Sequence, residues 1–223
     1  MKTLTKTCLP VLALLGLLAG CSSDPVAPQD TLPPATAEDA AFQAGLVAYA
    51  VTEIGPQIMQ VANPAKEVRD IVFSGDRNLT GTVHLDYRMG PDGVPAAAGD
   101  ATWVRLFTAS GDPVVYTVPE LGGQTGFDLD VMATLDHMAG QATILEGSNG
   151  TMTSGDTVVT FTLQGIVVGS SGYPQQGGMT ITSGEHTAEV MFNGTSVVTM
   201  IVDSSSTYFI DLDTGTVTEG VPI

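Results

Sequence analysis

Basic side chains are scarce in this sequence. Its 223 residues include 7 Lys and Arg against 24 Asp and Glu, which gives a formal net charge of −17. After Arg105 the chain has 13 acidic residues and no Lys or Arg. A nucleic-acid-binding surface needs clustered basic side chains, so the composition excludes that class. A disordered acidic chain is excluded as well, because 14% charged and 43% hydrophobic residues are typical of a chain that folds around a core.

Cysteine is equally scarce. The two cysteines, Cys8 and Cys21, both stand near the N-terminus. The remainder of the chain therefore forms no disulfide and offers no Cys nucleophile, Cys zinc ligand or iron–sulfur ligand. Its stability must come from an apolar core, which a chain of roughly 200 residues can build.

The first 20 residues have the pattern of a secretory signal peptide. Lys2 and Lys6 precede an apolar run from Leu9 to Leu18, and small residues follow. The run is about ten residues long, well short of the roughly 20 that a membrane-spanning helix needs. We therefore expect residues 1–20 to be a signal that is removed.

The end of this segment, Leu18-Ala19-Gly20-Cys21, resembles the lipobox of bacterial lipoproteins. The resemblance covers about a tenth of the chain. It implies cleavage by signal peptidase II before Cys21, and attachment of diacylglycerol and an amide-linked acyl chain such as palmitate to that cysteine. Each buried acyl CH₂ contributes about 0.8 kcal/mol, so two or three chains anchor a protein stably. The alternative is an ordinary secretory signal followed by a chance cysteine.

Residues 21–36 carry the lipidated cysteine and a tether. Four prolines and almost no large apolar side chain predict an extended spacer, with a rise of about 3.1 Å per residue where it is polyproline-like. Ser22 resembles the residue after the cysteine in lipoproteins that reach the outer membrane, where an Asp favours the inner one. We therefore expect a lipid-anchored protein of the cell envelope, in the outer membrane, on a face that the sequence leaves open.

A helix is predicted over residues 37–63. Thr36 and Asp39 approximate a capping box, and two apolar rows give the helix a broad buried surface. Gly55-Pro56 is expected to break or kink this helix, and Asn63-Pro64 to end it. The alternative, a helix lying on a membrane surface, lacks the Lys and Arg residues typical of such helices.

Residues 66–223 are predicted to form antiparallel strands. Apolar and polar residues alternate in four segments, which indicates strands with one buried face: 83–88, 127–136, 187–192 and 208–213. Turn signals separate the strands, among them Asn149-Gly150, Asn193-Gly194 and Asp213-Thr214-Gly215. A tripeptide of Ser, Gly and an acid recurs at residues 74, 110, 154 and 183 and is interpreted as repeated turn chemistry. The fold class is therefore mainly β: an antiparallel meander, as a curled sheet or half-barrel, with the N-terminal helix packed on it. Two sandwiched sheets are the alternative.

Few residues are candidates for chemistry. His84 and Asp86 project from one strand face and could start a metal site, and Asp128 and Asp130 form a similar acidic pair. Asp211 and Asp213 enter a glycine turn and could contribute to a Ca²⁺ site on an acidic strand face. His137 and His186 each follow an acidic residue and are interpreted as solvent groups. No catalytic motif, nucleotide-binding loop or other cofactor signature occurs, so we expect no catalytic residues and no cofactor.

The function expected from these observations is non-catalytic. We expect an anchored envelope protein with a binding or structural role, whose membrane contact is the lipid at Cys21 and whose partner is an envelope protein or a hydrophobic small molecule. The first alternative is a carrier of a lipid or other hydrophobic ligand in an apolar cup between sheet and helix. That alternative rests on fold-level analogy with periplasmic lipoprotein carriers and receptors. A hydrolase that uses Asp and Glu, or His84 and Asp86, is the less favoured third class.

Overall fold

The computed structural model describes residues 36–61, 68–75, 78–90, 92–117, 123–169 and 172–220, and for residues 54–61 the backbone alone. The signal segment, Cys21 and all of the tether predicted over 21–36 except Thr36 lie outside the described residues. Residues 34–223 form one compact unit, which holds both the helix and all the strands.

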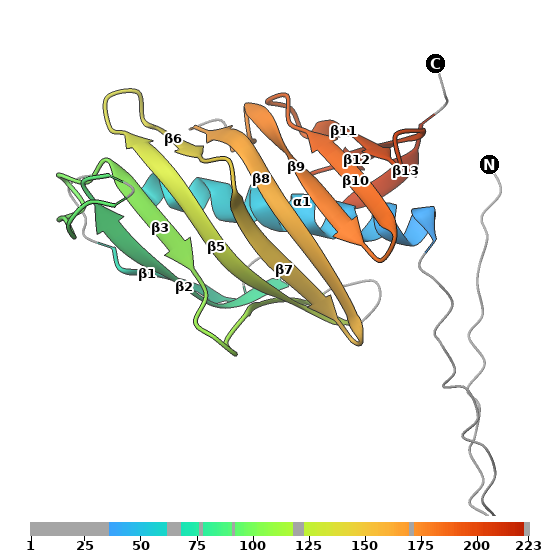
Figure 1. The fold of residues 1–223 in the computed structure, drawn as a ribbon, viewed down its shortest axis with the longest axis horizontal. Helices are drawn as coiled ribbons and strands as arrows, with labels where there is room; N and C mark the ends of the chain where they lie inside the picture. The colour runs from blue at the N-terminus through green and yellow to red at the C-terminus, as the bar shows by residue number, and fades with distance from the viewer. Residues whose placement is uncertain are drawn as a thin grey trace, which may run out of the picture. The chain divides into compact units, whose positions relative to one another are not determined.

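A single antiparallel sheet of 13 strands makes up most of this unit, as the alternation predicts, and it confirms the mainly β fold class (Figure 1). The strands are β1 (Asp70–Ser74), β2 (Leu79–Arg88), β3 (Trp103–Phe107), β4 (Val114–Thr117), β5 (Gln124–Asp136), β6 (Gln141–Ile144), β7 (Ser148–Ser154), β8 (Thr157–Val168), β9 (Gln176–Ser183), β10 (His186–Met191), β11 (Val197–Val202), β12 (Ser206–Asp211) and β13 (Thr216–Glu219). Their order across the sheet is β1-β2-β3-β5-β6-β8-β9-β10-β11-β12-β13, with β4 between β2 and β5 and β7 between β5 and β8. All described strands belong to this one sheet, so the sandwich alternative is wrong.

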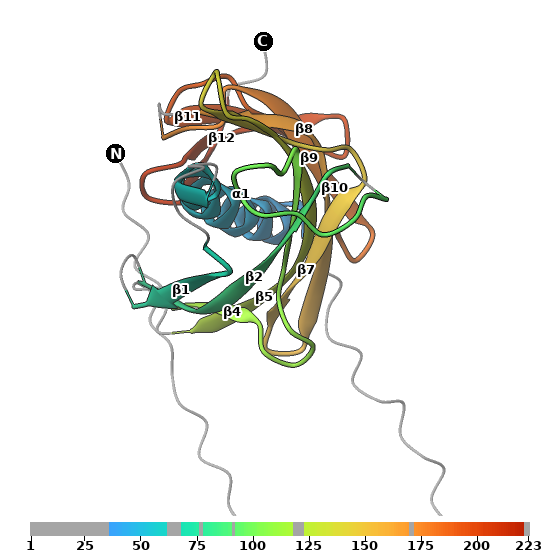
Figure 2. The same ribbon diagram turned by 90° about the vertical axis from the view of Figure 1, so that its left-hand side faces the viewer.

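The helix α1 (Ala37–Val61) lies in the concave face of the curled sheet (Figure 2). It contacts β6 and β8 to β13. Ala44, Val47 and Ala48 are fully buried there, in the same apolar cluster as the inward side chains of the strands. The prediction that the helix packs on the sheet is therefore confirmed, and the membrane-surface alternative is wrong.

The N-terminus of α1 carries the expected capping box. The backbone N–H of Asp39 donates to Thr36 Oγ1 at 3.1 Å, and the backbone N–H of Thr36 donates to Asp39 Oδ2 at 3.0 Å. These bonds satisfy two N–H groups at a helix start that has no preceding turn to bond them. The local sequence thus sets where the helix begins.

Two local predictions are wrong. Gly55-Pro56, expected to break or kink α1, does not break it, and the helix runs to Val61; the cost of an internal proline, about 3 kcal/mol, falls on a helix whose preceding turns are anchored in the core. The kink stays a prediction, and the predicted helix end at Asn63-Pro64 lies outside the described residues. Asn149-Gly150 is not a turn but lies inside β7, where Gly150 pairs with Leu129 on one side and Phe161 on the other. The close approach of the Phe161 ring requires glycine at that position. The same Asn-Gly dipeptide occurs at Asn193-Gly194, and there it does join β10 to β11.

The recurring Ser-Gly-acid tripeptide does form turns. Gly75, Gly111, Gly155 and Gly184 have φ values of 98°, 80°, 58° and 59°, a region that glycine adopts without strain. The last two of these turns connect β7 to β8 and β9 to β10. The tripeptide therefore recurs because each of these turns uses a glycine with a positive φ.

Candidate functional site

A groove of about 710 Å³ opens along α1 between the two ends of the sheet. The first three turns of the helix form its floor, with Ala41, Phe42, Leu46 and Tyr49 at helical spacing. The turn between β12 and β13, together with β13, forms one wall. Asn78 and Tyr116, from the start of β2 and from β4, form the other. The groove thus joins parts of the chain that lie more than 100 residues apart.

Two glycines set the wall beside the helix. A Cβ atom at Gly45 would overlap Cγ2 of Val217, so only glycine lets β13 approach α1 this closely. Gly215 lies in the turn from β12 to β13 with a φ of 70°, which glycine adopts without strain, and a Cβ atom there would lie at an ordinary contact distance, 3.6 Å, from Cβ of Tyr49. The close approach of the wall to the helix therefore depends on Gly45, and the shape of the turn on Gly215.

Aromatic side chains dominate the lining. The rings of Tyr49 and Tyr116 lie with centroids 5.2 Å apart and planes tilted by 44°, an arrangement favourable for aromatic pairs. Tyr208 joins them from β12, and all three tyrosines are largely buried. Phe42 is the exposed member, with 41% of its surface accessible, and presents an apolar face to solvent at the groove.

Carboxylates stand around these rings. Glu38 on α1, Asp213 in the turn after β12 and Glu219 on β13 line the groove, and none of the described lining residues is Lys, Arg or His. Burial raises the pKa of the Tyr208 phenol, and the negative charges of Glu219 and Glu38 raise it further. One acid of the helix floor and one of the β13 wall therefore act on the same phenol, which indicates a negative potential around it.

Asp213 is additionally held by a tyrosine outside the groove lining. The Tyr173 hydroxyl donates to Asp213 Oδ1 at 2.5 Å, and the backbone N–H of Asp213 donates to Asp211 Oδ1 at 2.9 Å. The bond to Asp213 is the largest cause that raises the pKa of Tyr173 above its ordinary value. These bonds fix the turn that carries Asp213, and they leave its second oxygen for another contact.

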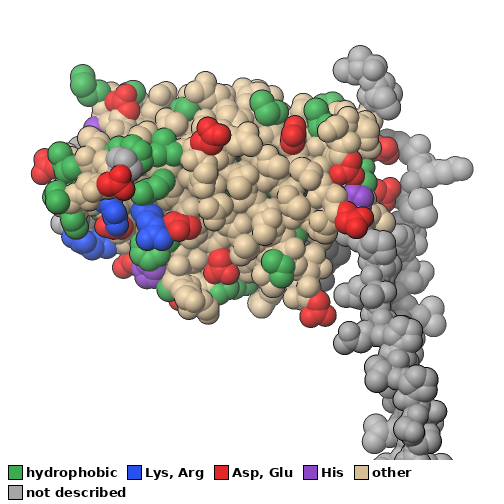
Figure 3. Space-filling view, in the orientation of Figure 1, with side chains coloured by type: hydrophobic (Ala, Val, Ile, Leu, Met, Phe, Trp, Pro, Cys, Tyr) green, Lys and Arg blue, Asp and Glu red, His purple; other side chains and the backbone are tan. Residues whose placement is uncertain are grey.

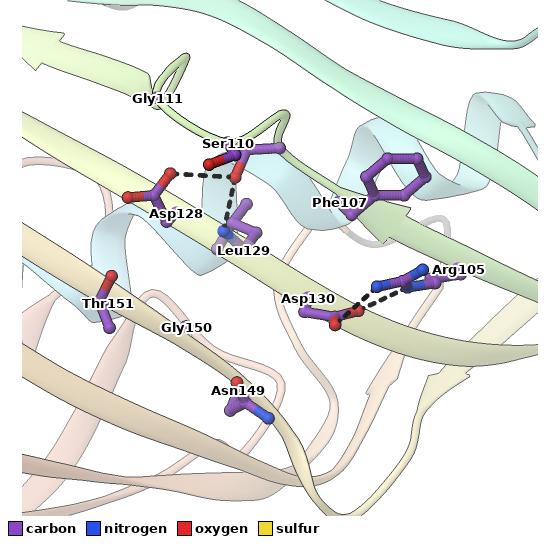
Figure 4. A pocket seen from close by; sticks show the side chains of 11 residues that line it. Arg105, Phe107, Ser110, Gly111, Asp128, Leu129, Asp130, Asn149, Gly150 and Thr151 are labelled. Atoms are coloured by element: carbon purple, nitrogen blue, oxygen red, sulfur yellow. Dashed lines mark hydrogen bonds and ion pairs between the residues drawn. The ribbon is translucent and has the colours of Figure 1, made fainter.

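A second hollow, of about 340 Å³, lies on the outer face of the sheet (Figure 4). Here Arg105 and Asp130 point toward each other, with Nε to Oδ1 at 2.7 Å and the terminal nitrogen to Oδ2 at 2.8 Å. This pair lowers the pKa of Asp130 below its ordinary value, and the Arg105 guanidinium lies 4.9 Å from the centroid of the Phe107 ring. The one basic side chain of the described lining is thus already paired with Asp130, and the hollow has about half the volume of the groove, so it is less suited to a ligand.

Asp128 and Asp130 do share one strand face, as the alternation predicts, but they have different partners. Thr108 Oγ1 donates to Asp128 Oδ1 at 3.3 Å, whereas Asp130 binds Arg105. The sequence analysis missed Arg105. Its place opposite Met132 in the β3–β5 register brings it beside Asp130, a long-range pairing that no local spacing signals.

His84 and Asp86 are not brought together as a metal site. His84 Nδ1 lies 2.7 Å from Asp70 Oδ1 on the neighbouring strand β1, and Asp86 accepts from the Arg88 guanidinium at 2.7 Å. Asp211 caps the turn after β12, where its Oδ1 accepts from Asp213, and Asp213 lies in that turn rather than on the strand. Among the residues that the structure describes, no three His, Cys, Asp or Glu side chains gather as metal ligands would.

The other two histidines also bind partners that are not adjacent in sequence. A ring nitrogen of His137, Nε2, lies 2.9 Å from the Ala101 carbonyl oxygen, and His186 Nδ1 lies 2.6 Å from Asp203 Oδ2. Both rings are partly exposed, as expected of solvent groups, but each also links two segments of the fold. His84, His137 and His186 stand on separate elements and form no common cluster.

Comparisons with protein-family models, with curated proteins and with solved structures give no match to this chain. Within the described part of the chain, no helix has the length and apolar character needed to cross a membrane. The groove along α1 is therefore the candidate functional site of the described fold.

Proposed function

We propose that this chain is a lipid-anchored protein of the bacterial envelope that binds a small amphipathic molecule in the groove along α1. The anchor is inferred from the lipobox-like residues that end at Cys21. The observation that carries the binding role is the volume of the groove, about 710 Å³, which lies within the roughly 300–1,000 Å³ typical of ligand sites.

The lining suits a ligand with both apolar and polar parts. Phe42, Leu46 and the tyrosine rings offer apolar surface, and the threonines and carboxylates of the β12–β13 segment offer polar contacts. A large apolar side chain exposed at such a place favours a binding role, because burying it against a ligand recovers hydrophobic free energy. These features support a binding role for the groove.

This site differs from the apolar cup of the carrier alternative. Buried side chains of α1 and of the strands it contacts form one packed cluster, which occupies the space between them. The groove lies instead at the flank of the helix, between the ends of the sheet, and carries acidic residues. A ligand that fits it has a polar or charged group as well as an apolar body.

The anchor is tested by Cys21→Ser. Radiolabelled palmitate should enter the wild-type protein, expressed in a Gram-negative host, and not the variant, because no acyl chains can be attached without the cysteine. The variant should also keep residues 1–20, because signal peptidase II does not cut without the lipidated cysteine, and mass spectrometry measures the retained segment. Palmitate in the variant, or none in the wild type, would overturn the proposed anchor.

The binding role is tested by two matched variants of residues 22–223. Phe42 and Phe209 are both 41% exposed, but only Phe42 lines the groove. Native mass spectrometry is expected to find a co-purified small molecule in the wild-type protein and in Phe209→Ala. Occupancy should fall about tenfold in Phe42→Ala, as loss of an apolar contact worth about 1.4 kcal/mol predicts. Equal occupancy in both variants, or none in the wild type, contradicts the groove as the site.

A further inference from the structure

We infer that the groove along α1 selects an organic cation: an ammonium or guanidinium group joined to an apolar chain or ring. This inference rests on the proposed binding function and names the ligand class. It follows from the combination of carboxylates, aromatic rings and apolar floor in one groove, and from the absence of any basic side chain among the described residues that line it.

Charge complementarity is the first argument. Glu38, Asp213 and Glu219 contribute three carboxylates from three segments of the chain. An anionic ligand in this groove would meet like charge on several sides, and a neutral one would leave the carboxylates without a counterion. A cation would be attracted, and it would pair with acids that no described Lys or Arg of the lining neutralises.

The aromatic rings supply the second argument. A cation near the face of a Tyr ring is attracted by the ring quadrupole, by about 0.5–2 kcal/mol depending on desolvation. Tyr49, Tyr116 and Tyr208 line the groove, although each is largely buried, and the charges of Glu219 and Glu38 act on the Tyr208 phenol. Rings and carboxylates therefore favour the same positive group.

The helix floor determines the rest of the ligand. Ala41, Phe42 and Leu46 give the groove an apolar strip beside the charged rim. A small inorganic cation would leave this strip in water, whereas an aliphatic or aromatic body attached to the charged group would cover it. The two parts of the lining together define an amphipathic cation.

Three fluorescent probes separate these ligand classes. Dansylcadaverine has an aromatic body and a primary ammonium group, N-pentyl dansylamide has the same tether without charge, and N-dansyl-6-aminohexanoate ends in a carboxylate. We expect residues 22–223 to bind the cationic probe at least about tenfold more tightly than the neutral one, and the anionic probe most weakly. The preference should decline as salt is raised, because it is electrostatic.

Two triple variants carry the decisive comparison. Glu38→Gln, Asp213→Asn and Glu219→Gln together remove the groove carboxylates. Glu146→Gln, Asp156→Asn and Glu189→Gln remove three exposed acids elsewhere and change the net charge equally. The first variant is expected to lose the preference for the cationic probe while still binding the neutral one, and the second to behave as wild type. Circular dichroism of each variant checks that the fold is kept.

The possible failures differ from one another. Equal affinity of wild type for the cationic and neutral probes, or an unchanged preference in the groove variant, overturns cation selectivity and leaves the binding function standing. Equal loss of preference in both triple variants also overturns it, because the effect is then one of net charge. If no probe binds the wild type and nothing co-purifies with it, the proposed binding function fails as well.

Discussion

Gly150 offers a sharp test of the packing, because its replacement by alanine brings an atom into occupied space. The residue lies in β7 between β5 and β8. A Cβ atom there would stand 2.5 Å from the carbonyl oxygen of Asp128 and 2.9 Å from Cε2 of Phe161, and closer still to Cζ of that ring. Ordinary contacts of a Cβ atom are 3.4–4 Å, so the neighbours would have to move by about 1 Å.

The loss of stability in Gly150→Ala depends on how far the neighbouring atoms can move. Phe161 is 2% exposed and packed in the core, so its ring cannot swing away freely. The Asp128 carbonyl belongs to the paired strand β5, so its displacement disturbs the ladder. Overpacking of this kind costs about 1–3 kcal/mol, and alanine recovers about 0.5–1 kcal/mol of the entropy that glycine loses in a strand. We expect Gly150→Ala to lower the free energy of unfolding by about 1–2 kcal/mol.

Urea denaturation followed by the fluorescence of the single tryptophan, Trp103, and by circular dichroism measures this change. Gly123→Ala is the control, because nothing lies within 4 Å of a Cβ atom at Gly123, and the free energy should change by less than about 0.5 kcal/mol. A double-mutant cycle with Phe161→Leu should show a positive coupling of about 1 kcal/mol, since the ring contact is relieved and the carbonyl contact is not. Equal stability of Gly150→Ala and Gly123→Ala would refute the close approach.

Two other predictions concern the helix start and the outer ion pair. Thr36→Ala removes the capping bond to Asp39 and should lower the free energy of unfolding by about 1 kcal/mol, whereas Thr36→Ser should keep most of it, as measured by urea denaturation. Asp130→Asn should cost at most about 1 kcal/mol at pH 7, because the pair with Arg105 is substantially exposed. Since the pKa of Asp130 is lowered in the folded state, this stabilisation is present above about pH 4 and is lost as the pH falls through the folded pKa. A difference between wild type and Asp130→Asn that persists at pH 2 would contradict that assignment.

The sequence predicts those features of the fold that depend on neighbouring residues. The capping box needs only residues 36 and 39. The β5 strand needs only the alternation from Phe127 to Leu135, in which every second residue, starting with Phe127, is apolar and buried. The turns at Gly155 and Gly184 need only a glycine with positive φ between residues that cap the backbone. The physical cause of each of these features lies in residues that are close in sequence, so the sequence alone is enough to predict them.

Features that depend on distant contacts could not be predicted in this way. Asn149-Gly150 has the composition of a turn, but its glycine is required by the Phe161 ring from the next strand. The groove joins residues 38–49 to 208–219 and to Tyr116, and the pairing of Tyr49 with Tyr116 exists only because the curled sheet brings β4 to the helix. The histidine partners Asp70, Ala101 and Asp203 are likewise supplied by neighbouring segments.

The basic and acidic side chains are distributed unevenly over the folded unit. The described basic residues, Arg69, Arg88 and Arg105, gather at the β1–β3 end of the sheet, where Figure 3 shows the Lys and Arg atoms close together. Arg88 and Arg105 are bound there to Asp86 and Asp130. The acids of the C-terminal strands therefore have no Lys or Arg in their own part of the chain, and three acids of the unit line one groove with aromatic rings. Acidic residues spread evenly over the surface would contribute to solubility alone. Acidic residues placed around tyrosine rings instead favour a ligand that carries a positive charge.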